Sequence, residues 1–143
     1  MSTTTFSVDS NVIVSLLNQE KELSGRALLA LERSRRSGHL VVSGPVYAEL
    51  LGLPARTPLI LDNFFKSAGI EVDWHFDEAI WHAAGVAYQG YVRRRVADSK
   101  ELPRRILTDF LIGAQVIVRS YTLLTFDKRL YVSSFPGIRV ETF

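Results

Sequence analysis

Strand-like runs and helical segments follow one another along the chain, and the runs are largely apolar without a strict apolar–polar alternation. The five runs are FSVD, HLVVSG, IEVDW, YTLLTF and IRVETF. Strands that are apolar on both faces are typical of a parallel sheet, because its crossover helices cover both sides. The sequence therefore predicts an α/β, Rossmann-like fold in three layers. Its central parallel sheet would have four to five strands flanked by helices, with IRVETF at an edge.

Several helices have predictable ends. A helix over about 22–37 is expected to stop at Gly38, and a long amphipathic helix is expected from Asp77 to the arginine run 93–95. The segment DFLIGAQVIVRS is apolar on nearly every side, which predicts a central, buried helix. Thr108 is the expected N-cap of that helix.

Length and residue usage set the context. The chain has 143 residues and no cysteine, so it can build one complete core but no disulfide framework or thiolate metal site. No apolar run approaches the roughly 20 residues that cross a bilayer, and the start MSTTTFSVDS does not resemble a signal peptide. We therefore expect a single domain over residues 1–143, located in the cytoplasm and not in a membrane.

Four acidic residues are predicted to meet at one edge of the sheet. Asp9 ends the first strand and Asp127 follows the fourth. Asp109 lies at the amino end of the buried helix, and Glu49 lies about one turn into the helix after the second strand. Ligands of open parallel sheets bind beyond the carboxyl ends of the strands, which is where these side chains are expected. Each residue also has a plainer interpretation: Asp9 as a helix cap, Glu49 as a solvated residue, Asp109 as a first-turn charge and Asp127 as a turn residue.

A pocket that gathers four carboxylates favours a bound cation. Two unit charges about 4 Å apart repel by roughly 4 kcal/mol at an effective dielectric constant near 20. The chain offers no cysteine, and its three histidines are isolated in the sequence. All-oxygen ligands favour Mg²⁺ or Mn²⁺ over zinc.

The basic residues are clustered although the net charge is only +2. One cluster contains Arg26, Arg33, Arg35 and Arg36, and the other contains Arg93, Arg94, Arg95, Lys100, Arg104 and Arg105. Such a density of cations is either a solvated helix face or a binding surface for a polyanion such as nucleic acid.

The order of VDSN, VYAEL, LTDFLIGA, LLTFD and FPGIRVETF resembles the PIN-domain ribonucleases, and most closely the VapC toxins of bacterial toxin–antitoxin pairs. The resemblance extends from Phe6 to Phe143, and the tandem of DFLIGA with LLTFD is its most specific part. It implies a metal-dependent endoribonuclease that hydrolyses RNA phosphodiester bonds and uses Mg²⁺ or Mn²⁺. It also implies a cognate antitoxin as partner and a homodimer.

The resemblance assigns roles to residues. Asp9, Glu49, Asp109 and Asp127 match the catalytic, metal-holding positions, while Ser10, Asn11 and Thr125 match positions that orient those carboxylates by hydrogen bonding. The candidates for holding RNA phosphates are Arg93, Arg94, Arg95, Arg104 and Arg105. Two positions depart from the pattern: Gln115 stands where relatives often have histidine, and Tyr131 where many have phenylalanine.

Other functions remain open. A phosphatase that uses a phosphoaspartate also places an Asp after the first strand, but it normally needs a second acid where this chain has Asn11. A PIN-like module that binds RNA or protein without catalysis is the stronger alternative. The segment PARTPLILDNFF is expected either to pack in the core or to offer a groove to an antitoxin or a second copy.

Overall fold

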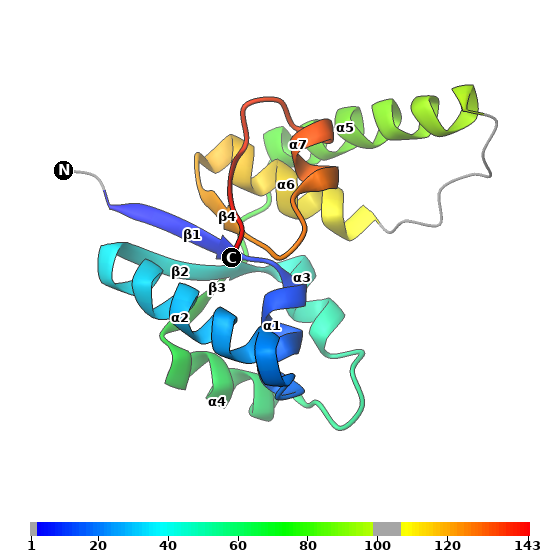
Figure 1. Ribbon diagram of the computed structural model, residues 1–143. Coiled ribbons are helices and arrows are strands. Elements are labelled where there is room, and N and C mark those ends of the chain that lie inside the picture. The colour runs from blue at the N-terminus through cyan, green and yellow to red at the C-terminus, as the bar shows by residue number, and fades with distance from the viewer. Residues whose placement is uncertain (1–2, 99–106) are drawn as a thin grey trace.

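The computed structural model describes residues 3–98 and 107–143, which form five strands and seven helices (Figure 1). The amino-terminal elements are β1 (Thr4–Val8), α1 (Ser10–Leu17), α2 (Lys21–Ser37), β2 (Gly38–Ser43), α3 (Gly44–Leu50) and α4 (Pro58–Ala68). The remaining elements are β3 (Ile70–Asp73), α5 (Glu78–Ala97), α6 (Leu107–Arg119), β4 (Thr122–Leu124), α7 (Arg129–Ser134) and β5 (Arg139–Glu141).

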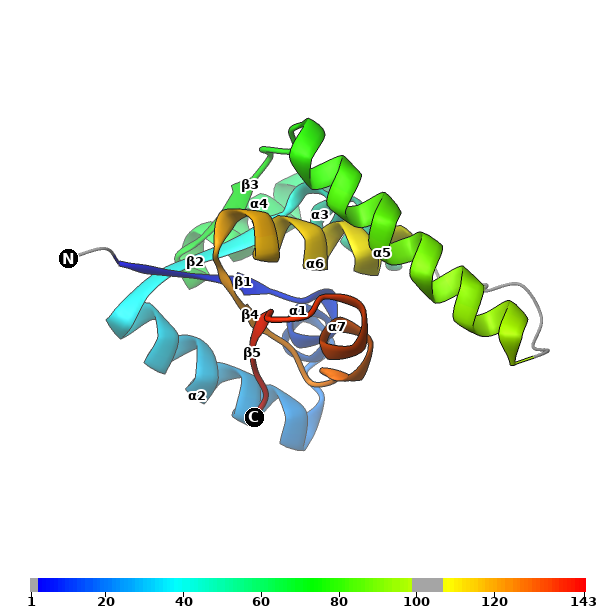
Figure 2. The ribbon, with the colours of Figure 1, turned by 90° about the horizontal axis from the view of Figure 1, so that it is seen from above.

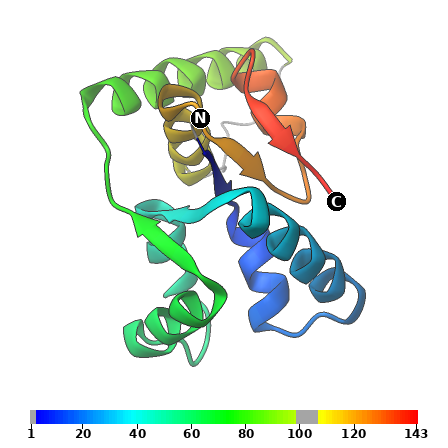
Figure 3. The same cartoon turned by 90° about the vertical axis from the view of Figure 1, so that its left-hand side faces the viewer.

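The five strands form one sheet in the order β3-β2-β1-β4-β5, and every neighbouring pair is parallel. Figure 3 shows β1 in the middle, with β2 and β3 to one side and β4 and β5 to the other. The predicted fold class and the position of the last strand at an edge are thereby confirmed. This order places the carboxyl ends of β1 and β4 side by side, because Val8 pairs with Leu124.

Helices cover the sheet in two groups. The strands lie between α1, α2 and α4 on one side and α5, α6 and α7 on the other (Figures 1 and 2). The second group has its own apolar cluster, in which Phe110 packs against Tyr88, Tyr91 and Phe135. Among the described residues, no helix is both long enough and apolar enough to span a bilayer.

The position of α6 between two apolar clusters explains its apolar composition. Phe110 and Ala114 belong to the cluster with α5, while Ile112 and Val116 belong to the main core together with strand residues such as Val8. All seven residues 110–116 are buried, so the predicted central position is confirmed. The prediction for Thr108 was wrong: α6 begins at Leu107, which puts Thr108 and Asp109 inside its first turn.

Gly38 ends α2 as expected. The reason is the close approach of the β1 backbone and not a left-handed backbone conformation. Its φ of −172° is extended, and it is already the first residue of β2, paired with Thr4. A Cβ atom at this position would lie 1.9 Å from the carbonyl oxygen of Thr4. Glycine therefore permits the close approach of β1 and β2 directly after a helix.

Candidate active site

A cavity of about 910 Å³ lies at the carboxyl ends of β1 and β4, and the four predicted acids line it. Each acid comes from a different part of the fold. Asp9 follows β1, Glu49 belongs to α3, Asp109 to the first turn of α6, and Asp127 to the loop between β4 and α7. The other lining residues are Ser10, Asn11, Tyr91, Arg129, Leu130, Tyr131 and Ser133. Residues far apart in the sequence thus line one cavity.

Asp9 is the most buried of the four, with 4% of its surface exposed. It is the N-cap of α1, where its Oδ1 accepts a 2.7 Å hydrogen bond from the backbone N–H of Ser10. Its Oδ2 accepts hydrogen bonds from the hydroxyls of Thr125, at 2.8 Å, and Tyr131, at 2.9 Å. The capping role and the place in the cavity therefore belong to the same carboxylate.

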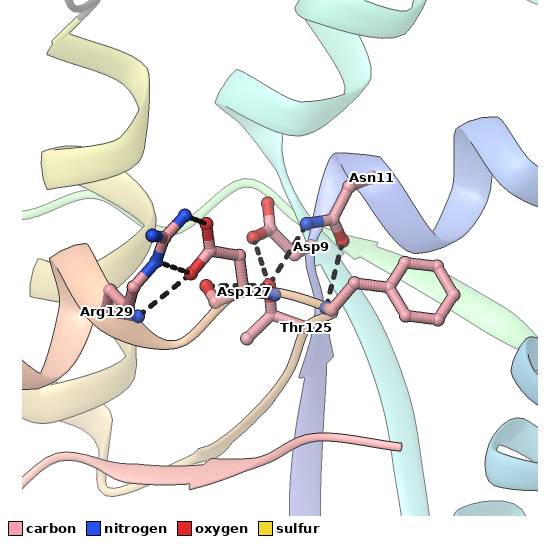
Figure 4. Close-up of polar contacts among 6 residues, drawn as sticks. Asp9, Asn11, Thr125, Asp127 and Arg129 are labelled. Atoms are coloured by element: carbon pink, nitrogen blue, oxygen red, sulfur yellow. Dashed lines mark hydrogen bonds and ion pairs between the residues drawn. The ribbon is translucent and has the colours of Figure 1, made fainter. Parts of the chain in front are cut away.

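Thr125 connects the first and fourth strands at this point. Besides donating to Asp9, its hydroxyl oxygen lies 3.2 Å from Nδ2 of Asn11 and 3.2 Å from the backbone N of Asp127, and accepts from both (Figure 4). Oδ1 of Asn11 in turn accepts a 3.4 Å hydrogen bond from the backbone N of Phe126. The three residues predicted to orient the carboxylates are thus in contact with Asp9 or with one another.

Tyr131 is a site residue that sequence reasoning noted only as a departure from phenylalanine. It lies on the buried face of α7, with 3% of its surface exposed. Burial and the negative charges of Asp9, Asp109 and Glu49 raise the pKa of its hydroxyl far above the usual value, so it stays a donor. The available signal was the hydroxyl group at a position where many relatives have phenylalanine, because a buried phenol needs a hydrogen-bond partner.

The electrostatics of the cavity favour added positive charge. Burial, together with the smaller effect of the charge of Asp109, raises the pKa of Asp9 from 3.8 to about 6, although hydrogen bonds from Thr125, Tyr131 and Ser10 act in the opposite direction. Ionising Asp9 therefore costs more free energy in the metal-free folded chain than in water. A cation among these oxygens would remove that penalty.

The acids are near one another without yet forming a finished metal site. Glu49 is exposed and Asp109 is half-buried. Both oxygens of Asp127 accept hydrogen bonds from the guanidinium of Arg129, at 3.0 and 2.9 Å. In residues 3–98 and 107–143, no three acidic or histidine side chains are already grouped closely enough to surround one ion. The acidic side chains that line the cavity nevertheless offer carboxylate oxygens only, the type of ligand that suits Mg²⁺ or Mn²⁺.

The basic residues have different positions. Arg93, Arg94 and Arg95 occupy the last turns of α5, where the first two are exposed and Arg95 is half-buried. None of them lines the cavity, but Tyr91, half a turn earlier on α5, does. Arg104 and Arg105 lie outside the described residues.

Two further sequence-based expectations have a structural outcome. Gln115 is fully buried, and its Nε2 donates to the backbone oxygen of His75 at 3.1 Å. In PARTPLILDNFF, Leu61 and Phe65 are core residues, whereas Leu59 and Ile60 are 70% and 43% exposed. Part of that segment therefore packs inside and part of it faces outward.

Several solved structures share this fold. A chain of VapBC2 from Rickettsia felis, bound to a DNA fragment from the promoter, matches with a TM-score of 0.64 and 19% identity, covering 98% of this chain and 99% of that one. VapBC-1 from nontypeable Haemophilus influenzae matches with a TM-score of 0.63 and 16% identity over 97% and 98% of the two chains. FitAcB from Neisseria gonorrhoeae matches with a TM-score of 0.58 and 19% identity over 94% and 95%.

The sequence itself gives the assignment. No curated protein matches it significantly. Residues 7–135, however, match the PIN domain family, and this span includes all four acids, Thr125 and Tyr131. The chain belongs to the PIN domain family.

Proposed function

We propose that this chain is a metal-dependent ribonuclease that hydrolyses RNA phosphodiester bonds with Mg²⁺ or Mn²⁺. The observation that carries the proposal is the cavity at the carboxyl ends of β1 and β4, which is lined by four carboxylates from four separate elements. Membership of the PIN domain family, which implies nuclease chemistry, supports the same conclusion.

Asp9, Glu49, Asp109 and Asp127 would hold the cation. When bound, a divalent cation lowers the pKa of a coordinated water and stabilises the negative charge that develops on the phosphate during cleavage. The carboxylates then have two tasks: they keep the cation in the cavity, and one of them accepts the proton of the attacking water.

The remaining polar residues prepare Asp9 for this role. The backbone N–H of Ser10 and the hydroxyls of Thr125 and Tyr131 hold both oxygens of the carboxylate in a fixed orientation. Asn11 in turn holds Thr125. A carboxylate oriented in advance loses less conformational entropy when a ligand arrives. The arginines at 93–95, 104 and 105 would bind RNA phosphates.

The biological role we propose is that of the toxin in a VapBC-type toxin–antitoxin pair in the cytoplasm. The structural neighbours from Rickettsia felis and Haemophilus influenzae are chains of VapBC complexes, and the alignments cover nearly all of each chain. The exposed side chains of Leu59 and Ile60 on α4 are candidates for contact with an antitoxin or with a second copy in a homodimer.

A PIN-like binding module without catalysis is the second candidate. Two observations favour it. Both oxygens of Asp127 are engaged by Arg129, and no three metal-ligating side chains are grouped among the described residues. The two candidates differ in whether a divalent cation produces RNA cleavage.

The experiment is cleavage of a mixed RNA pool with Mg²⁺, with Mn²⁺ and with EDTA, comparing the wild type with Asp9→Asn. Asp62→Asn is the matched control, because Asp62 lies exposed on α4 and its oxygen accepts a hydrogen bond from Tyr47 that an amide oxygen can also accept. The nuclease predicts cation-dependent cleavage by the wild type and Asp62→Asn but not by Asp9→Asn. Equal activity in all three proteins, or none despite bound cation, contradicts it. Sequencing of cut ends after brief expression, with and without the neighbouring gene product, would identify the target and test the toxin role.

A further inference from the structure

Arg129 holds Asp127 in a two-pronged ion pair at the wall of the cavity. Nε of Arg129 donates to Oδ1 of Asp127 at 3.0 Å, and its Nη2 donates to Oδ2 at 2.9 Å (Figure 4). The backbone N–H of Arg129 adds a third hydrogen bond to Oδ1, at 3.1 Å. In this arrangement, Asp127 already has a cation as its partner.

The charges around the cavity make this pair unusual. Among the described residues that line it, Arg129 is the only cationic side chain, against four acidic ones. The guanidinium therefore acts as a counterion built into the chain. It occupies the same carboxylate that the proposed metal site requires, so Arg129 and a metal ion compete for Asp127.

The pair is accessible and weak enough to open. The side chain of Arg129 is 88% exposed and that of Asp127 is 50% exposed. Ion pairs in such surroundings contribute little, because water screens them and both side chains lose freedom. A divalent cation shared by several carboxylates interacts with Asp127 more strongly than a single solvated guanidinium does.

A displaced Arg129 side chain remains near the site. Arg129 is the first residue of α7, two positions after Asp127, so its backbone stays at the cavity wall. A guanidinium offers a planar pair of N–H donors that matches two phosphate oxygens, as it matches the two carboxylate oxygens here. An RNA phosphate entering the cavity would supply such a partner.

We propose that Arg129 exchanges partners: it neutralises Asp127 while no divalent cation is bound, and it binds the RNA phosphate when a cation takes Asp127. This inference rests on the nuclease function proposed above and names one residue that touches the substrate. It adds a cationic residue on α7, at the cavity wall, to the arginines on α5 as a proposed partner of RNA.

The first test measures metal affinity without any cleavage. Calorimetric titration with Mn²⁺ compares the wild type, Arg129→Gln and Lys128→Gln. Lys128 is the matched control, because it is an exposed neighbouring cation that does not line the cavity. Arg129→Gln should bind Mn²⁺ about two- to fivefold more tightly, the range expected when an exposed ion pair no longer has to open. Lys128→Gln should bind like the wild type.

The second test measures RNA affinity. A labelled single-stranded oligoribonucleotide is titrated in Ca²⁺ over a salt series, with a check that the RNA remains intact. Arg129→Gln should bind more weakly, and its logarithmic salt slope should fall by about 0.7, the contribution of one phosphate contact on a single strand. Lys128→Gln should change neither quantity.

The outcomes separate this inference from the function beneath it. A wild type that binds no Mn²⁺ and cleaves no RNA contradicts the nuclease itself. A wild type that binds metal and cleaves RNA, while Arg129→Gln shows unchanged affinity for Mn²⁺ or for RNA, overturns only the exchange of partners. Equal effects of Arg129→Gln and Lys128→Gln also overturn it, because general loss of charge would then explain the result.

Discussion

The hydroxyl of Tyr131 donates a 2.9 Å hydrogen bond to Oδ2 of Asp9, although 122 positions separate the two residues in the sequence. Thr125 donates to the same oxygen, and the backbone of Ser10 donates to Oδ1. The carboxylate that ends β1 is therefore oriented by residues from α1, from the end of β4 and from α7. Its environment combines burial, which disfavours the charged form, with donors that favour it.

Tyr131→Phe should lower the stability of the folded chain. Phenylalanine fills the same space but leaves Asp9 with one donor fewer, and hydrogen bonds to a charged group contribute about 1.5–3 kcal/mol. The loss should be largest above about pH 6, where Asp9 is ionised, and smaller near pH 4, where it is mostly protonated. Urea unfolding at several pH values measures it. Tyr88→Phe, whose ring packs edge-on against Phe110, is the control, and equal losses in both variants would contradict the assignment.

Asp9→Asn should stabilise the metal-free chain at neutral pH. The folded-state pKa of Asp9 is raised from 3.8 to about 6. Stability from this group is therefore fully present below about pH 3.8 and is lost as the pH rises through 6. The ionised residue lowers the free energy of unfolding by up to about 3 kcal/mol above that range. Urea unfolding in EDTA should show Asp9→Asn and the wild type alike near pH 3.8, with the variant more stable above pH 6; the reverse order would refute this view of Asp9.

Divalent cations should offset most of that difference. A ligand that binds only the folded chain raises the free energy of unfolding by about 2.7 kcal/mol at one hundred times its Kd. Mg²⁺ or Mn²⁺ should therefore raise the melting temperature of the wild type and of Asp62→Asn but not that of Asp9→Asn. Thermal unfolding over a metal titration measures this. A shift of equal size in Asp9→Asn would place the bound ion somewhere else.

Gly38→Ala should destabilise the fold, whereas Gly25→Ala should not. A Cβ at position 38 would lie 1.9 Å from the carbonyl oxygen of Thr4, so the β1 and β2 backbones would have to separate, at a cost of at least about 2 kcal/mol. Gly25 lies inside α2, and a Cβ there would have no described atom within 4 Å apart from its chain neighbours and the surrounding helix backbone. Alanine there should stabilise the helix by about 0.5–1 kcal/mol. Chemical unfolding of the two variants should therefore give opposite signs.

Reversing Arg104 and Arg105 to Glu should weaken RNA binding and flatten its dependence on salt. Each lost phosphate contact lowers the logarithmic salt slope by about 0.7 on a single strand. Arg33 and Arg36, which are exposed on α2, provide a control pair with the same change of charge. Fluorescence anisotropy over a salt series measures both, and unchanged binding by the 104 and 105 variant would remove these residues from the role.

The sequence was sufficient to predict that the four acids lie at one edge of the sheet, because that placement follows from the topology. In a parallel sheet, a residue at the end of one strand lies close to a residue at the end of the next, whatever their separation in the chain. The burial of α6 was likewise predicted from its sequence, because a helix that is apolar on nearly every side must be covered on both faces.

Side-chain partners could not be predicted in the same way. The pairing of Arg129 with Asp127 depends on rotamers of two exposed residues, and the contact of Tyr131 with Asp9 depends on how α7 packs against α5 and α6. A cap at Thr108 would start α6 at Asp109, two residues after Leu107, because Thr108 is a good cap by type and the choice between neighbouring residues depends on local backbone geometry.

The backbone N–H of Asp9 donates a 2.9 Å hydrogen bond to the carbonyl oxygen of Leu124, so the first strand is completed by one of the last. A ribosome synthesises the first strand long before the fourth has emerged. Unfinished polypeptides consequently lack Thr125, Asp127 and Tyr131 beside Asp9, and no truncated product ending before β4 can assemble the proposed site. For a protein proposed to cut RNA, this means that the translation machinery is not exposed to its activity until β4 and the residues up to Tyr131 have been synthesised.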